Sequence, residues 1–177
     1  MPSLVLTLIG VDRPGLVESV AKIICDQKGN WLESRMAHLA GQFAGIVRVD
    51  VAEEHADHLV ESLQRLDEVG LKVIALKDAT PATHDDVSLI HLDLVGNDRP
   101  GIVSEVSHVL AELNVNVEEF QTECREAANS GSTLFRATAE LRLPSSLSID
   151  RLQAALEDIA LDLMVDIQLA EPVPGDA

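Results

Sequence analysis

The feature that most constrains this chain is an internal repeat. Residues 10–17 read Gly-Val-Asp-Arg-Pro-Gly-Leu-Val, and residues 96–103 read Gly-Asn-Asp-Arg-Pro-Gly-Ile-Val, at an offset of 86 positions. The same offset places Asn30 on Asn116. Farther along, residues 46–48 match residues 134–136 at an offset of 88, which predicts two extra residues in the second copy. We therefore predict two copies of one folding unit.

The same order of hydrophobic periods occurs in both copies. Alternating or continuous apolar runs predict strands, and apolar residues three and four apart predict helices with one buried face. In the first copy, strands are expected at about 4–9, 30–40, 43–52 and 71–76, and helices at 16–24 and 59–66. In the second, strands are expected at 87–95, 115–127, 132–143 and 163–169, and helices at 102–113 and 152–159. The order is β-α-β-β-α-β, so the predicted fold class is α+β, two ferredoxin-like units in which two helices cover one face of a four-stranded antiparallel sheet.

The predicted organisation is a first domain at 1–79, a linker at 80–86, a second domain at 87–171 and a C-terminal tail at 172–177. The linker has the composition of a connecting segment, with Thr, Pro, Asp and His. Each half is small, and its uncovered sheet face or sheet edge needs a partner. We therefore expect the halves or whole chains to pack together, and predict a homo-oligomer.

Composition narrows the function classes. The 177 residues are 46% hydrophobic and 24% charged, which is typical of a soluble globular protein, and with 2% aromatics the core must be aliphatic. Thirteen Lys and Arg against thirty Asp and Glu give a net charge of −17, which repels nucleic acid. No apolar run reaches the roughly 18 residues of a membrane span. We predict a cytoplasmic protein with reduced thiols, Cys25 being in the core.

The repeated turn is the strongest candidate for a site. Pro14 and Pro100 lie where a helix starts, and Asp12 and Asp98 are placed to accept hydrogen bonds from the first-turn amides. Glycines let backbone amides approach a ligand closely, and they occur here at Gly10, Gly15, Gly96 and Gly101. A helix N-terminus favours an anion such as a carboxylate. The alternative is that the turn is only a helix cap.

Two polar pairs accompany the turn. Asn30 and Asn116 open the second strand of each copy, which we expect to start close to the turn, where an amide can donate to and accept from an amino-acid ligand. Their alternative role is to tolerate a tight helix-to-strand turn. Arg13 and Arg99 are expected to face solvent, with an anion clamp as the alternative.

Other groups give weaker signals. His55 and His58 have a spacing that would suit a metal on a helix face, but no third ligand can be assigned, and a solvated acidic helix start is the simpler interpretation. No nucleophile elbow, phosphate-binding loop or zinc-protease motif is present in the sequence. We predict no catalytic residues, no cofactor and no metal.

On these residues the chain resembles the ACT-domain family of small-molecule-binding regulatory modules, over about residues 3–170. The repeated Gly-x-Asp-Arg-Pro-Gly-(Leu/Ile)-Val motif and the Asn that follows each first helix carry the resemblance. The segment Asn30-Trp-Leu-Glu-Ser-Arg35 and the two-copy organisation resemble the glycine-cleavage-system transcriptional repressor group.

The resemblance implies a non-enzymatic regulator that binds an amino acid, glycine being the first candidate, and that acts through a regulatory protein partner. It implies sites between units near the turns, lined by Gly10, Asp12, Gly15 and Asn30, and by Gly96, Asp98, Gly101 and Asn116. The second copy differs by carrying Asn97 for Val11 and Val115 for Gly29. Two alternatives stay open: a small ferredoxin-like hydrolase of phosphate or acyl-phosphate substrates, and a scaffold that binds no ligand.

Overall fold

Each copy of the repeat folds as β-α-β-β-α-β in the computed structural model, which describes residues 3–78 and 88–172. The chain divides into two compact units, Met1–Ala82 (unit 1) and Thr83–Ala177 (unit 2). The predicted linker, 80–86, and nearly all of the predicted tail, 172–177, lie outside the described residues. The exact domain limits therefore stay a prediction.

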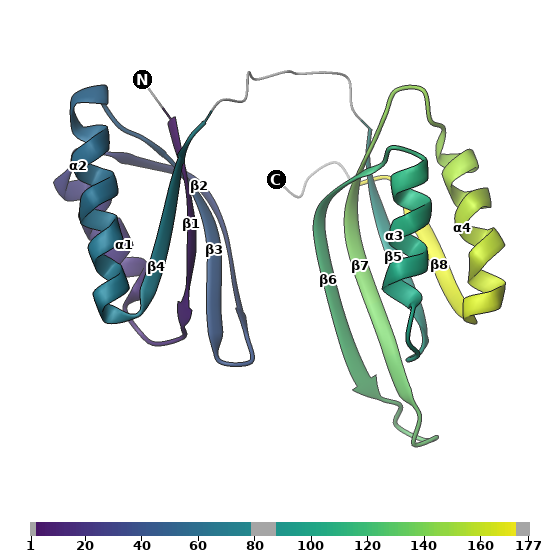
Figure 1. The fold of residues 1–177 in the computed structure, drawn as a ribbon. Coiled ribbons are helices and arrows are strands. Elements are labelled where there is room, and N and C mark those ends of the chain that lie inside the picture. The colour runs from purple at the N-terminus through teal and green to yellow at the C-terminus, as the bar shows by residue number, and fades with distance from the viewer. Residues whose placement is uncertain (1–2, 79–87, 173–177) are drawn as a thin grey trace. The chain divides into compact units, whose positions relative to one another are not determined.

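The elements follow the expected periods closely (Figure 1). Unit 1 contains β1 (Ser3–Val11), α1 (Leu16–Asp26), β2 (Asn30–Leu39), β3 (Gln42–Asp50), α2 (Glu53–Gln64), a 3-10 turn η1 (Arg65–Val69) and β4 (Leu71–Lys77). Unit 2 contains β5 (Ser88–Asn97), α3 (Ile102–Glu112), β6 (Asn116–Glu126), β7 (Thr133–Leu143), α4 (Ile149–Leu163) and β8 (Val165–Ala170).

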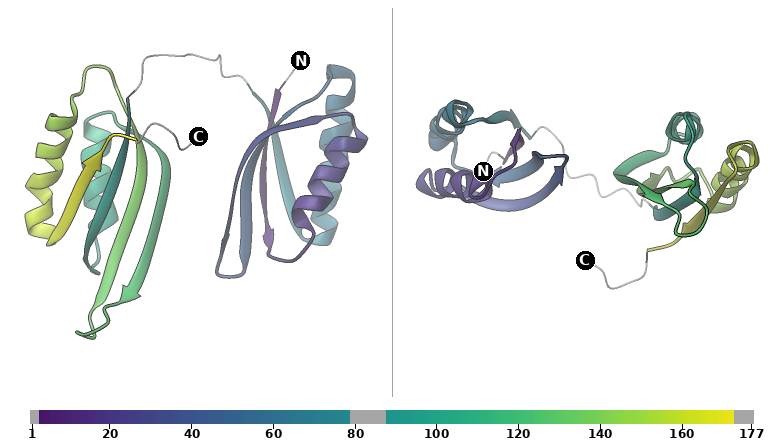
Figure 2. Two further views of the ribbon diagram at one scale, coloured as in Figure 1. Left: turned by 180° about the vertical axis from the view of Figure 1, so that it is seen from behind. Right: turned by 90° about the horizontal axis from the view of Figure 1, so that it is seen from below.

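Each unit is a four-stranded antiparallel sheet with two helices on one face. The strand order is β2-β3-β1-β4 in unit 1 and β6-β7-β5-β8 in unit 2. The ribbon views show α1 and α2 on one side of the first sheet, and α3 and α4 on one side of the second (Figures 1 and 2). Within residues 3–78 and 88–172, the opposite side of each sheet carries no helix or strand of its own unit. The predicted α+β ferredoxin-like fold is confirmed in both halves.

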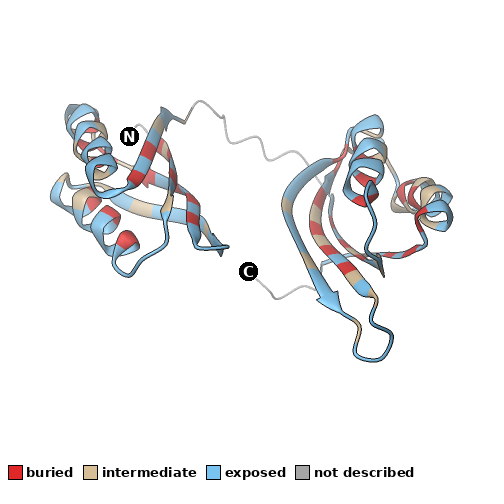
Figure 3. Ribbon diagram, turned by 60° about the horizontal axis from the view of Figure 1, so that its bottom comes forward, coloured by how far each residue is buried: buried red, intermediate tan, exposed pale blue. Residues whose placement is uncertain are grey.

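Both cores are aliphatic and lie between the sheet and its helices. In β1, Leu4, Leu6 and Leu8 are buried, while the residues between them are more exposed (Figure 3). Strand side chains alternate between the two faces of a sheet, so one face supplies the core. The helix α1 adds Leu16 and Val20, spaced as the apolar stripe predicts. No polar side chain is buried among the described residues.

The second hairpin is longer than the sequence alignment predicts. Gly10 pairs with Phe43 in unit 1, and Gly96 pairs with Phe135 in unit 2. The two phenylalanines are 92 positions apart, whereas the two glycines are 86 apart, so the second hairpin holds six extra residues. The predicted offset of 88 is wrong because it matched letters without the sheet register.

Candidate functional site

The repeated turn joins β1 to α1, and β5 to α3. In each turn the residue before the helix is a glycine in the left-handed conformation, with φ of 90° at Gly15 and 99° at Gly101. A β-carbon added at either position would meet nothing within 4 Å. These glycines are therefore required by backbone conformation, because other residues pay a steric cost at positive φ.

The first turn of each of these helices has backbone amides without a side-chain cap. The first helical bonds run from the Ser19 amide to the Gly15 carbonyl, at 3.0 Å, and from the Glu105 amide to the Gly101 carbonyl, at 2.9 Å. The three amides before each bond have no acceptor within the helix, and no side chain caps α1 or α3. The expectation that Asp12 and Asp98 cap these helices is wrong. The turn instead leaves donors at the positive end of a helix dipole.

Both aspartates are fixed within the repeated turn by backbone bonds. The Asp12 amide donates to the Gly41 carbonyl at 2.9 Å, and the Asp98 amide donates to the Thr133 carbonyl at 2.8 Å. Each turn is thereby fixed to the end of the neighbouring hairpin. The Asp12 carboxylate lies 3.4 Å from the His38 imidazole, and both side chains are exposed. Each repeated turn therefore carries a carboxylate and leads into free helix amides, and these groups are complementary to a molecule that carries one positive and one negative charge.

Unit 2 lacks the histidine of this pair. His38 is opposite Phe43 in its ladder, and Cys124 is opposite Phe135 at the corresponding place.

Neither of the two cysteine thiols is in a disulfide: Cys25 and Cys124 are both free and exposed. The predicted burial of Cys25 is wrong, because the buried stripe of α1 runs through its neighbour Ile24 and not through residue 25.

Gly10 and Gly96 serve packing inside their own units. A β-carbon on Gly10 would collide with the Gly70 carbonyl oxygen, and one on Gly96 would lie 2.8 Å from the Met164 carbonyl oxygen. These carbonyls precede the last strand of each unit. Sequence reasoning assigned both glycines to ligand approach, but the spacing alone did not show that the last strand starts against them.

Arg13 and Arg99 have matching roles that the sequence did not reveal. The Arg13 guanidinium donates to the Val69 carbonyl in η1, and that of Arg99 donates to the Asp162 carbonyl in α4, at 2.9 Å. Both arginines are exposed, as predicted. Each one ties the repeated turn to the end of the unit's second helix, where unpaired carbonyls attract a cation. This contact accounts for their repetition without an anionic ligand.

The two asparagines lie at the other end of the sheet. In the ladder Asn30 is level with Asp50 and Ser3, whereas Val11, next to the turn, is level with Gln42 and Leu39. Eight strand steps separate the two rows, or about 26 Å at 3.3 Å per residue. The expectation that Asn30 and Asn116 start close to the turn of their own unit is therefore wrong. The second strand runs in the same direction as the first, so it begins where the first begins.

The helix-to-strand turn is made by other residues. The left-handed positions are Lys28 and Asn114, two residues before the asparagines. In unit 2 the Asn116 amide donates to the Glu118 carboxylate at 2.6 Å, and Arg142 donates to the same carboxylate at 3.1 Å. Asn30 is exposed at the matching corner of unit 1. Neither asparagine is required by turn geometry.

The open sheet faces carry the remaining polar groups. In unit 2 two shallow hollows on this face share His91 and Thr138: one also includes Gln121 of β6, and the other includes Asp93 of β5 and Gln168 of β8. Arg136 donates to Asp93 at 2.6 Å, and this hydrogen bond, with the attraction of the carboxylate, raises the pKa of the guanidinium. Arg136 and Asp93 thus form an ion pair on an exposed surface.

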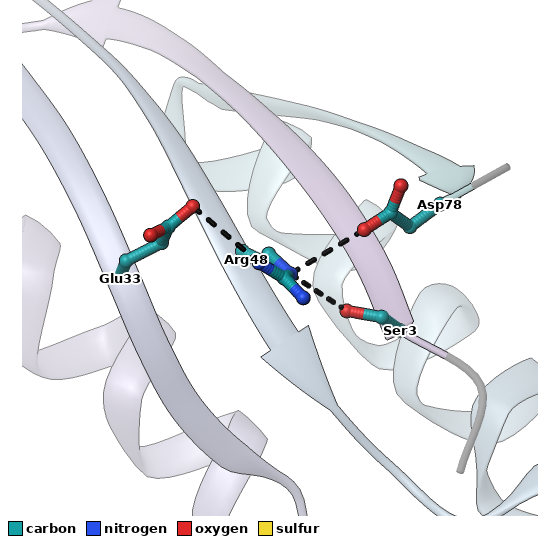
Figure 4. A network of polar contacts seen from close by, with 4 residues as sticks. All are labelled: Ser3, Glu33, Arg48 and Asp78. Carbon is teal, nitrogen blue, oxygen red and sulfur yellow. Dashed lines mark hydrogen bonds and ion pairs between the residues drawn. The ribbon is translucent and has the colours of Figure 1, made fainter. Parts of the chain in front are cut away.

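In unit 1 the corresponding polar network lies at the corner where β1 begins (Figure 4). Arg48 contacts Asp78 at 3.3 Å, Ser3 at 3.2 Å and Glu33 at 3.7 Å. The Asp78 amide also donates to the Ser3 carbonyl at 2.7 Å. One arginine thus links the first three strands to the residue after β4.

The weaker candidates gain no support. His55 and His58 both lie on α2, as predicted, and His55 is 3.5 Å from Glu54. Within residues 3–78 and 88–172, no group of three or more His, Cys, Asp or Glu side chains is arranged to hold a metal ion.

None of the helices that the structure describes is both long and apolar enough to span a membrane.

Known proteins resemble the chain in sequence and in structure. Residues 3–74 match the family profile of the ACT domain. A UPF0237 protein of Methanococcus maripaludis is 32% identical over 76 residues, which are 41% of this chain and 84% of the relative. An unknown protein from Galdieria sulphuraria has a crystal structure with a TM-score of 0.88 and 30% identity, covering 97% of this chain and 99% of that one.

A further crystal structure matches the complete two-unit arrangement of elements. Its protein is provisionally described as a glycine cleavage system transcriptional repressor; the TM-score is 0.71, with 17% identity over 96% of each chain. At that identity the likeness shows the fold alone. The profile match, the relative at 32% identity and the two β-α-β-β-α-β units show that this chain belongs to the ACT-domain family, with one ACT-type unit in each half.

Proposed function

We propose that the protein is a non-enzymatic regulator that senses an amino acid at its repeated turns and acts through a protein partner. The observation that carries this proposal is the pair of uncapped helix N-termini, each preceded in the same turn by an aspartate that a backbone bond fixes to the neighbouring hairpin. A bound amino acid would place its carboxylate on the helix amides and its ammonium group on Asp12 or Asp98. Membership of the ACT-domain family, whose modules regulate, supports this assignment.

Glycine is the first candidate ligand. The two-unit structure provisionally described as a glycine cleavage system repressor has the same fold, which supports testing glycine before other amino acids. The helix dipole contributes only about 0.3–2 kcal/mol, so hydrogen bonds to the amides and the ion pair with the aspartate must supply the rest. We expect weak binding, with dissociation constants of roughly micromolar to millimolar, which correspond to about 8 and 4 kcal/mol. Binding in that range responds to changes in metabolite concentration.

The asparagines enter the proposal as separate contacts. Asn30 and Asn116 are at the far end of their own sheet from the turn, so neither reaches the ligand bound by its own unit. They contribute amide contacts only if the other unit or a second copy of the chain brings them to a turn. Variants at these two positions therefore test whether binding requires residues from outside the unit that carries the turn.

Regulation of transcription would be indirect. A net charge of −17 opposes approach to DNA, because phosphate contacts require basic side chains. We propose that a separate protein carries the effect to its target. A gel-shift titration of the purified protein alone tests this: specific DNA binding at physiological salt would refute the indirect mechanism.

Calorimetric titration with glycine, serine, alanine and other amino acids tests the sensor. Asp12→Asn and Asp98→Asn should each remove binding at one turn, because an amide does not pair with an ammonium ion as a carboxylate does. His58→Ala, an exposed change on α2, is the control and should leave binding unchanged. Unchanged affinity in both aspartate variants would refute the proposed sites. Absence of binding by every amino acid would favour the scaffold, and turnover in a phosphatase screen would favour the hydrolase.

A further inference from the structure

The helix-free side of the unit 1 sheet carries an apolar patch; we call this side the first open face. Thr7 of β1 pairs with Ile46 of β3 and Ile74 of β4, and Ile46 pairs with Arg35 of the edge strand β2, so these four side chains share one row on that side. Ile46 is 55% exposed and Ile74 is 46% exposed. The neighbouring rows continue the surface with Val5, Ile9, Val11, Ala37, Leu39, Ala44 and Leu76.

The same side of the unit 2 sheet, the second open face, is polar. The ladder of unit 2 places Asp93 opposite Thr138 and Gln168, which are the positions of Thr7, Ile46 and Ile74. In the next row His91, Glu140 and Ala170 replace Val5, Arg48 and Leu76. The fold tolerates polar side chains at these positions, so folding of the unit does not require the isoleucines of the first open face.

Solvent exposure of so many aliphatic side chains has a free-energy cost. Contiguous apolar patches larger than a few hundred Å² are uncommon on monomers and mark interaction sites. Four strands spaced about 4.8 Å apart, over a β1-length run of residues rising about 3.3 Å each, give a face on the order of 500 Å². Two such faces packed together would bury about 1,000 Å², which is the lower limit for a specific interface.

We propose that the first open face packs against the first open face of a second copy of the chain, which gives a dimer with twofold symmetry. Two sheets that pack face to face lie about 10 Å apart and interdigitate apolar side chains from both. A twofold interface is made by the same patch on both copies, so an apolar patch on one copy meets an equally apolar patch on the other.

The second open face does not fit as the occupant. Covering the isoleucines with the second open face would remove Asp93, Glu140 and His91 from water, and contacts with an aliphatic surface would not offset the cost of their desolvation.

The first open face also has the polar margin of an interface. At one corner Arg48 is already paired with Glu33 and Asp78 (Figure 4), Arg35 lies on the edge strand β2, and Lys72 lies in the Ile9 row of β4. An apolar centre with a polar rim is the usual anatomy of a protein interface.

This dimer is independent of ligand binding, so it can be tested without an amino acid. Light scattering coupled to gel filtration, at several protein concentrations, should give a mass approaching twice that of the chain. The double variant Ile46→Thr, Ile74→Gln carries the residues that unit 2 has at these positions and is therefore compatible with the fold. We expect it to raise the dimer dissociation constant at least tenfold, because two isoleucines leave the centre of the interface on each copy.

The matched control is Thr138→Lys, Gln168→Lys on the second open face, which should leave the dissociation constant unchanged. Added sodium chloride should not weaken the dimer, because screening acts on charges and not on apolar contacts. Circular dichroism confirms that each variant is folded, and Leu76→Gln serves as a second variant of the face. A wild-type protein that is monomeric at all concentrations would overturn the proposal. A dimer that persists in the Ile46, Ile74 and Leu76 variants would also overturn it. So would a dimer that dissociates only in the Thr138→Lys, Gln168→Lys control.

Discussion

Unit 1 presents Ile46 and Ile74 on its open sheet face, whereas unit 2 presents Thr138 and Gln168 at the same ladder positions. Their buried faces do not differ in this way: leucines and valines alternate toward the helices in both. The comparison teaches that the side chains facing the helices determine the fold, whereas the side chains on the open face of the sheet can differ between the units without changing it. One unit of the chain is suited to pack against an apolar partner, and the other is suited to face water.

The comparison also separates shared from individual features at the repeated turn. Both units keep the left-handed glycine, the uncapped helix and an arginine that holds the end of the second helix. Only unit 1 has a histidine beside the aspartate. The turn is thus one inherited structure, and any difference in ligand preference between the units must come from residues such as His38 and Cys124.

The largest expected effect comes from the buried strands. Leu6 and its counterpart Leu92 are 0% and 2% exposed, and replacing either with alanine should destabilise its own unit by about 2–5 kcal/mol. If the units unfold separately, Leu6→Ala lowers the transition temperature of unit 1 alone, by about 10 °C or more. Leu92→Ala should do the same to unit 2.

Differential scanning calorimetry of the full chain, with each unit expressed alone as the reference, resolves the two transitions. Equal shifts of both transitions with either variant would contradict the presence of two separate cores.

An intermediate effect on stability is expected from Gly10 and Gly96, the two glycines that pack against the start of the last strand in their units.

Gly10→Ala places a methyl group against the Gly70 carbonyl oxygen, which is backbone and cannot rotate away. In unit 2, Gly96→Ala meets the Val165 side chain first and the Met164 carbonyl oxygen at 2.8 Å. We expect each variant to lose about 1–3 kcal/mol of unfolding free energy, with the larger loss at Gly10. Urea denaturation measures the difference, and a Gly10→Ala protein as stable as the wild type would show that β4 can shift.

Much of this fold is predictable because the duplicated pattern is regular. The helix of residues 16–24 and the strand of residues 71–76 appear nearly where the periodicity places them. Residues such as Leu16 and Val20 recur at helical spacing, and their burial follows from geometry. Duplication strengthens each assignment, since both copies must satisfy it.

The candidate site is only partly predictable. The left-handed Gly15 and the start of the helix follow from the motif, but the true position of Asn30 depends on strand direction and register. The contact between Arg13 and the Val69 carbonyl joins residues 56 positions apart, and no local pattern indicates it. The number of extra residues in the second hairpin is likewise underestimated from the sequence, as two instead of six, because a one-dimensional alignment does not contain the pairing of strands.

The smallest expected effect is at the sheet corners, where each unit has an exposed arginine. Arg48 contacts Asp78, Glu33 and Ser3, whereas Arg142 contacts Glu118. Exposed ion pairs contribute up to about 1 kcal/mol, so neither Arg48→Gln nor Arg142→Gln should lower the unfolding free energy by more. The loss should be larger for Arg48, because its guanidinium links the first three strands to the end of the fourth and Asp78 is only 14% exposed. Urea denaturation at low and high salt measures both, and the difference should shrink as salt rises. Equal losses at the two corners would show that the Asp78 contact adds nothing, and the corners would then count among the features that the units share.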